Sequence, residues 1–159
     1  MADPSIPATV QRLWTVPEAN ARIEDLKELL PQMGGWVHRL RAIHDELQRM
    51  SAFWGKESGA HDQPDRPVTD RLDGEFKQLT KRIEEEVGRL HAEGIEVKDL
   101  DAGLVDFLAR IDGDLVFLCW KHGEESVQYF HPLTGGFSGR RPLPGTRPAT
   151  TARSRAGGR

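Results

Sequence analysis

The sequence predicts an α+β fold that is mostly α: a long antiparallel helical hairpin followed by a small C-terminal antiparallel sheet of three strands. Two observations carry this prediction. Before Gly94, apolar residues recur at steps of four and three through two long segments, which is the spacing of one helix face. After Gly94 the apolar period falls to about two, which indicates strands.

The first helix is predicted from Val16 to about Phe53. Thr15 and Glu18 have the spacing of a capping box, in which two side chains satisfy free N–H groups at a helix start. Pro31 lies in mid-segment, but the apolar seam keeps its phase across it, so we expect one bent helix. The seam consists of Ala19, Ile23, Leu26, Leu30, Met33, Val37, Leu40, His44 and Leu47. We expect His44 to be a partly buried packing residue rather than a ligand.

The second helix is predicted from Thr69 to Glu93, because Gly94 suits the left-handed residue that ends a helix. A loop rich in Gly, Pro and charge at 55–67 separates the two helices, so they should pair antiparallel. Four apolar residues of the first helix lie off its seam and form a second stripe: Trp36, Ile43, Met50 and Trp54. Two helices cover only one stripe of each other, so the second stripe predicts a homo-oligomer formed through the helices.

Three short strands are predicted over 104–108, 115–121 and 127–131. An Asp-Gly pair at 112–113 is a two-residue hairpin pattern between the first two strands, and a Gly-Glu pair at 123–124 joins the second and third. If the second turn is tight, Cys119 faces Gln128, and His131 lies on the sheet face that packs on the helices. A bulge would swap the faces.

Net charge and cysteine content limit the classes of partner and compartment. The 159 residues carry a net charge of −3, from 22 basic and 25 acidic residues. Four arginines and no acid lie after Pro142, which leaves 18 basic against 25 acidic residues before them. This acidic body repels phosphates, so we expect no nucleic-acid binding except through the basic tail. A single cysteine excludes an internal disulfide. The sequence contains neither a long apolar run nor a signal-peptide pattern, so we expect a cytoplasmic protein with no membrane contact.

We divide the chain into a flexible N-terminus at 1–13, a single domain at 14–141 and a disordered basic tail at 142–159. Within the domain, residues 14–94 are the hairpin and residues 95–141 the β module. The tail is rich in Pro, Gly, Thr, Ala and Arg, without an apolar pattern that would let it join a core.

The β module carries most of the residues able to do chemistry. Asp106 lies inside an apolar strand, where a carboxylate needs a partner to offset its desolvation. His131 ends a strand, and an imidazole there suits proton transfer or metal binding. Arg140 follows a glycine-rich loop at 135–139 that lets it reach back to an acid or an anion. We predict that these three residues meet at one end of the sheet, with His131 opposite Val116.

Cys119, Glu124 and an acidic stretch are further candidates. A nucleophilic Cys119 would need a basic neighbour to lower its pKa; otherwise it is a small buried strand residue. Glu124 is a metal-ligand candidate together with Asp106 and His131, and a divalent metal is the cofactor that such ligands would take. The acids at 98–101 are expected to cap turns rather than to bind an ion.

Several of these residues belong to a wider pattern. It comprises Thr15-Val16-Pro17-Glu18-Ala19-Asn20, Lys98-Asp99, Gly103-Leu104-Val105-Asp106-Phe107, Leu118-Cys119-Trp120, Gly123-Glu124, His131 and Gly136-Phe137-Ser138-Gly139-Arg140. In these residues the chain resembles the DUF2203 family of prokaryotic proteins from roughly Leu13 to Leu143, except that Leu108 stands where relatives would have a proline. The resemblance implies no catalytic residues, because that family is one of unknown function. It does group Asp106, Trp120, Glu124, His131 and Arg140 in one shared pattern.

Two classes of function fit these residues. The hypothesis that we favour is a helical-hairpin interaction or binding module with a polar Asp/His/Arg site on its β module, because the seam is long and no catalytic motif is complete. The alternative is a small metal-dependent or acid/base enzyme that uses Asp106, His131 and Arg140 beside Cys119. A concave, partly open meeting place for the three residues would favour a site, and a fully covered His131 would favour a structural role.

Overall fold

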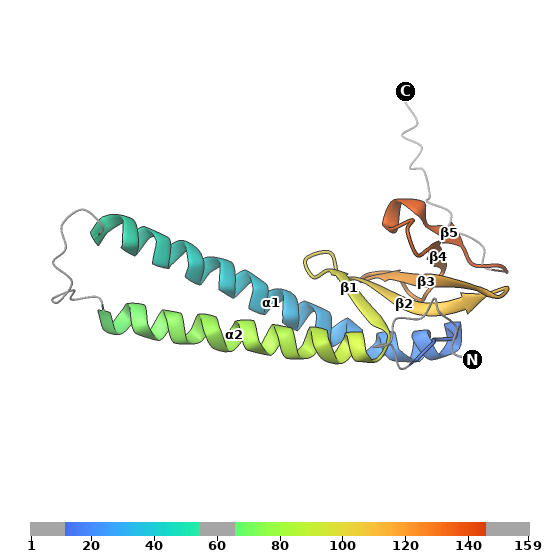
Figure 1. The fold of residues 1–159 in the computed structure, drawn as a ribbon, viewed down its shortest axis with the longest axis horizontal. Coiled ribbons are helices and arrows are strands. Elements are labelled where there is room, and N and C mark those ends of the chain that lie inside the picture. Colours follow the sequence, from blue (N-terminus) through green and yellow to red (C-terminus); the bar gives the residue numbers. More distant parts are fainter. Residues whose placement is uncertain (1–11, 55–65, 146–159) are drawn as a thin grey trace, which may run out of the picture.

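The fold is an α+β arrangement of a long helical hairpin and a five-stranded antiparallel sheet (Figure 1). The computed structural model describes residues 12–54 and 66–145. Its elements are α1 (Val16–Trp54), α2 (Arg66–Ala92), β1 (Ile95–Asp99), β2 (Leu104–Ile111), β3 (Asp114–Lys121), β4 (Tyr129–Pro132), the 3₁₀ turn η1 (Phe137–Gly139) and β5 (Arg141–Pro142). The strands follow one another across the sheet in the order of the chain. The predicted class is therefore confirmed, but three strands understate the sheet.

The first helix begins where its capping residues predict. The Thr15 backbone N–H donates to Glu18 Oε2 at 2.9 Å, and the Glu18 N–H donates to Thr15 Oγ1 at 3.4 Å. α1 then continues through Pro31 as one helix of 39 residues. α2 ends at Ala92, two residues before Gly94, whose φ of 81° is the left-handed conformation expected at a helix stop.

The two strands that sequence reasoning missed lie at the edges of the sheet. β1 pairs with β2 through Ile95 opposite Phe107 and Val97 opposite Val105. The alternation of apolar and charged residues from Ile95 to Lys98 is a strand pattern, but it follows the helix stop directly and resembles a connection. β5 has two residues, too few for any period to appear.

The β2–β3 hairpin has the predicted turn. Ile111 pairs with Asp114, and the two residues between them, Asp112 and Gly113, have φ of 51° and 90°. Two consecutive positive φ angles are those of a type I′ turn, which Asp-Gly adopts at little cost and which matches the twist of paired strands.

The pairing of β3 with β4 corrects the predicted register. Phe117 lies opposite His131, and Cys119 lies opposite Tyr129, one residue beyond the pairing that a tight turn would give. The connection from Gly123 to Gln128 is not a tight turn, because it is anchored elsewhere: the Val127 N–H donates to Asn20 Oδ1 of α1 at 2.8 Å. The one-residue shift places His131 on the face opposite the helices, whereas we predicted the helix face.

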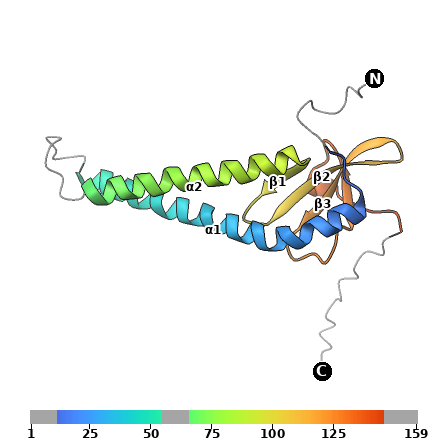
Figure 2. The same cartoon turned by 90° about the horizontal axis from the view of Figure 1, so that it is seen from below.

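The main core lies between the helices and one face of the sheet. It combines α1 residues Ile23, Leu26, Leu30 and Met33 with sheet residues Val105, Phe107, Val116, Leu118 and Trp120. Figure 2 shows α1 running beneath these strands. Trp14 joins them: its ring meets Phe107 edge-on at 5.3 Å, and its indole N–H donates to the Glu93 carbonyl at 2.7 Å.

The helical hairpin projects well past the sheet in both views (Figures 1 and 2). We call residues 40–54 and 66–83 the distal arm. Two predictions fail there. His44 is exposed rather than packed, and Ile43, assigned to a second outer stripe, is fully buried within the chain. Leu40 and Leu47 of the predicted seam stay half-buried, but the residue buried between them is Ile43 rather than His44.

The ordered domain extends past the boundary that we placed after Arg141. Leu143 is 5% exposed and belongs to the core, and its N–H donates to the Gln128 carbonyl at 2.9 Å. The remainder of the predicted tail, 146–159, and residues 1–11 of the predicted N-terminus lie outside the described residues. Neither described helix combines the length and the apolar character that a membrane span requires.

Candidate functional site

Three of the predicted site residues meet on the face of the sheet that points away from the helices. The register pairs Asp106 of β2 with Cys119 of β3, and it places His131 of β4 opposite Phe117, two residues from Cys119. Their strand neighbours Phe107, Leu118 and Trp120 point the other way, into the helix-side core. Cys119 and His131 share this face because the observed register differs by one residue from the predicted one.

The three side chains are closed off from solvent. Asp106 and His131 are each 1% exposed and Cys119 is 0% exposed. The connection from β4 through η1 to β5 rises over this side of β3, opposite the helices (Figure 1). The sheet is therefore covered on both faces, by helices on one and by its own C-terminal segment on the other.

Asp106 and His131 form a buried pair with a defined pattern of protons. His131 Nε2 lies 2.9 Å from Asp106 Oδ2, and His131 Nδ1 lies 2.7 Å from the Pro132 carbonyl oxygen. A carbonyl oxygen only accepts, so Nδ1 must carry a proton. Nε2 and Oδ2 then share a second proton, and the pair has no net charge whichever atom holds it.

The other carboxylate oxygen, Asp106 Oδ1, is buried and has no hydrogen-bond partner among the described residues. A buried acceptor left unpaired costs about 1–3 kcal/mol. A carboxylate oxygen has two lone pairs that a proton donor or a cation can use. Oδ1 is thus the atom of this cluster whose bonding is incomplete.

Cys119 is a neutral thiol in this environment. Burial raises its pKa to about 12, the negative charge of Asp106 adds to the rise, and the guanidinium of Arg140 opposes it. A thiolate nucleophile needs the opposite shift. The role of Cys119 as a nucleophile therefore finds no support in its surroundings.

Arg140 does not join the pair as we predicted. Its Nη2 donates to Glu124 Oε1, and its guanidinium lies 4.0 Å from the ring centre of Tyr129 and 4.6 Å from that of Phe137. Glu124 is held in turn, because its Oε2 accepts the Lys121 N–H at 2.9 Å. Its carboxylate is thus committed to Arg140 and the β3 backbone, and the structure groups Cys119, not Glu124, with Asp106 and His131.

The aromatic residues that hold Arg140 were not predicted as site residues. Tyr129 lies beside Cys119 across the strands, so Arg140 stacks on a ring next to the cluster. Arg140 Nε is buried and, like Asp106 Oδ1, has no hydrogen-bond partner among the described residues. The alternation of β4 could have placed Tyr129 beside Cys119, but only with the correct register.

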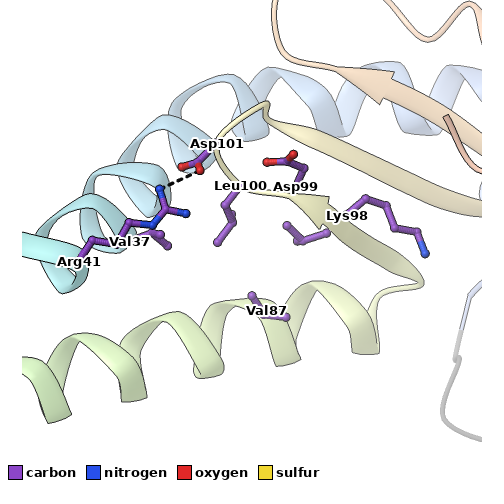
Figure 3. Close-up of a pocket in the computed structure, with 8 residues that line it drawn as sticks. Val37, Arg41, Val87, Lys98, Asp99, Leu100 and Asp101 are labelled. Carbon is purple, nitrogen blue, oxygen red and sulfur yellow. Dashed lines mark ion pairs between the residues drawn. The ribbon is translucent and has the colours of Figure 1, made fainter. Parts of the chain in front are cut away.

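The acids at 98–101 have the local role that we expected. Asp99 Oδ1 accepts the Ala102 N–H at 2.9 Å and so caps the β1–β2 turn, and Asp101 pairs with Arg41 of α1 at 2.9 Å. Figure 3 shows these residues around a cavity of about 320 Å³ between the helices and β1. A second cavity, of about 530 Å³, lies near the β2–β3 turn and is rimmed by Arg110 and Arg141. The residues lining these two cavities do not include Asp106, Cys119 or His131.

Comparison with known proteins identifies the chain at the level of its family. No curated protein and no solved structure matches it. One family model matches residues 12–143, which spans both helices, the sheet and every residue of the cluster. The chain therefore belongs to the family described as "Uncharacterized conserved protein (DUF2203)".

Proposed function

We propose that the protein is a binding module whose distal arm packs against the helices of a second copy. The support is a change in exposure along the hairpin. Where the sheet provides a third layer, the seam residues Ala19, Ile23, Leu26, Leu30 and Met33 are 0–1% exposed. In the distal arm, most apolar seam residues are only half-buried: Leu40, Leu47, Met50, Phe76, Leu79 and Ile83.

The physical reason is that two helices cannot enclose a seam between them. Each covers a single stripe of its neighbour, and apolar residues at the sides of the stripe stay in contact with water. Ile43 and Leu72 are buried in the arm, but Phe53 near its end is 75% exposed. A second hairpin laid antiparallel on the first would complete a four-helix bundle, the common way to bury such seams.

Two polar contacts link the helices near the base of the arm. Arg39 donates from Nε and Nη2 to the two carboxylate oxygens of Glu75 at 2.7 and 2.9 Å, and the Arg82 guanidinium covers the Trp36 ring at 4.3 Å. These contacts cover part of the surface near the base of the arm, and the half-buried apolar residues of the arm are the surface on which the proposed association depends.

Light scattering after size-exclusion chromatography tests this proposal. We expect a mass of twice the 17.9 kDa chain at tens of micromolar, falling on dilution. Leu47→Lys should lower the dimer's stability, because it places a charge on the half-buried stripe. Gln48→Lys adds the same charge at the adjacent exposed position and serves as the control. A strictly monomeric mass for the wild-type protein at tens of micromolar contradicts the proposal.

The buried Asp106–His131 pair supports a second candidate, an acid/base enzyme. A carboxylate that orients an imidazole is one part of the usual arrangement of a general base. However, both ring nitrogens of His131 are already engaged, Nε2 by Asp106 and Nδ1 by the Pro132 carbonyl, and both side chains of the pair are 1% exposed. A substrate would reach the imidazole only if the C-terminal segment moved aside. We therefore rank this candidate below the binding module.

A further inference from the structure

We propose that Asp106, Cys119 and His131 bind a divalent transition-metal ion of the zinc type. This site is separate from the association of the helices and does not depend on it. The three residues come from three adjacent strands, and each turns one donor atom towards the same point on the outer face of the sheet.

The spacing of the donor atoms is close to that of a metal site. A carboxylate oxygen of Asp106, Cys119 Sγ and a ring nitrogen of His131 all lie within 4.8 Å of one another. A tetrahedral zinc ion with bonds of about 2.0–2.3 Å holds its ligand atoms about 3.3–3.6 Å apart. The His131–Asp106 contact of 2.9 Å would open slightly and the wider separations would close, which side-chain rotations can accomplish.

Two further features of the cluster point to an ion rather than to packing. The Nδ1–H of His131 donates to the Pro132 carbonyl, the outer contact that orients a metal-binding imidazole so that Nε2 faces the ion. Asp106 Oδ1 is buried with no partner among the described residues, so the carboxylate has an unused oxygen in the cluster. The Cys119 thiol, which interacts with this carboxylate, is only a weak hydrogen-bond donor, so a cation would satisfy the buried oxygen better.

The charges balance both with and without the ion. Without it, the shared proton makes the Asp106–His131 pair neutral, and the Cys119 thiol is neutral. Binding of a divalent ion releases that shared proton and the thiol proton, which leaves carboxylate, thiolate and neutral imidazole around a charge of two. The buried site therefore carries no net charge in either state.

The donor types select the class of metal. Thiolate and imidazole favour zinc, cobalt and their neighbours, whereas magnesium and calcium take oxygen ligands. Three protein ligands leave the fourth tetrahedral position to water. Our sequence-based set held Glu124 in place of Cys119, and Glu124 now provides a control, because its carboxylate is committed to Arg140 and to the Lys121 N–H.

Cobalt titration of chelator-treated protein tests the site. We expect one equivalent of Co²⁺ to produce the visible absorption of a tetrahedral ion and a thiolate-to-cobalt charge-transfer band in the near ultraviolet, both removed by Zn²⁺. The chain has one cysteine, so the charge-transfer band of the wild-type protein can arise only from Cys119. Titration of the wild-type protein therefore decides whether Cys119 binds the ion, even if a variant fails to fold.

Variants assign the remaining ligands. Cys119→Ser should abolish the charge-transfer band. His131→Gln should weaken Co²⁺ binding by at least about tenfold, because loss of even an outer partner of a metal ligand lowers metal affinity by about 10–100-fold. His122→Gln, an exposed histidine three residues from Cys119, and Glu124→Gln should leave the affinity unchanged within about twofold. Absence of a saturable charge-transfer band in wild-type protein, or a band with octahedral rather than tetrahedral visible absorption, overturns the proposal.

Discussion

Removal of His131 from its buried pair should destabilise the fold more than removal of both partners. His131→Leu replaces the imidazole by an apolar residue of similar size and leaves the Asp106 carboxylate with neither oxygen paired, because Oδ1 already lacks a partner among the described residues. Breaking one side of a buried ion pair costs about 3–5 kcal/mol. That is a large part of the typical total stability of about 5–15 kcal/mol for a domain.

The double variant Asp106→Val/His131→Leu leaves no charge behind. Apolar replacement of a whole buried pair is often neutral or stabilising, so the double variant should be more stable than His131→Leu by at least about 2 kcal/mol. Urea unfolding of the wild-type protein, Asp106→Val, His131→Leu and the double variant at pH 7, in the presence of a chelator, measures these differences. Additive effects of the two single substitutions, or a cost below about 1 kcal/mol for His131→Leu, would show that the pair is not formed as described.

Three further predictions test other parts of the structure. Leu143→Ala should cost about 2–5 kcal/mol, because this side chain is 5% exposed in the core, whereas Leu133→Ala, at 44% exposure, should change the melting temperature little. Cys119 should resist thiol reagents at pH 8 in the folded, metal-free protein and react only on unfolding, since burial raises its pKa to about 12 and leaves roughly one thiol in ten thousand ionised. The hydrogen bond from the Thr15 N–H lowers the pKa of Glu18, so the ionised Glu18 side chain stabilises the fold at neutral pH, and this stabilisation is lost as the pH falls below 4.5. Glu18→Gln should therefore reduce the difference between the urea midpoints at pH 7 and about pH 3.

The elements with strong local determinants were predictable from the sequence. The capping residues Thr15 and Glu18 located the start of α1, Gly94 located the end of α2, and the Asp112–Gly113 turn located the β2–β3 hairpin. Each of these depends on residues a few positions apart, so a single sequence contains the whole determinant. Asp106 was also recognisable from its immediate neighbours, because a carboxylate inside an apolar strand needs a partner to offset its desolvation.

The features that depend on distant contacts were not predictable. The register of β4 follows from Asn20 in α1, more than 100 residues earlier, which accepts the Val127 N–H. The burial of Leu143 follows from its hydrogen bond to the Gln128 backbone. Cys119 rather than Glu124 lies in the cluster because of the observed register of β4. No local sequence pattern distinguishes this register from the predicted one, which differs from it by one residue.

The burial of His131 changes what its substitution can reveal. From the sequence, we took a fully covered His131 as a sign of a structural role, and by that criterion a large loss of stability on its substitution would argue against a site. At 1% exposure the loss is expected whether or not a metal binds, because the paired carboxylate remains buried in both cases. The free energy of unfolding therefore tests whether the Asp106–His131 pair is formed, and the cobalt spectrum tests whether the cluster binds a metal ion. The two roles are also compatible: a structural metal ion held by adjacent strands would stabilise the outer face of the sheet by satisfying the Asp106 oxygen that the described residues leave unpaired.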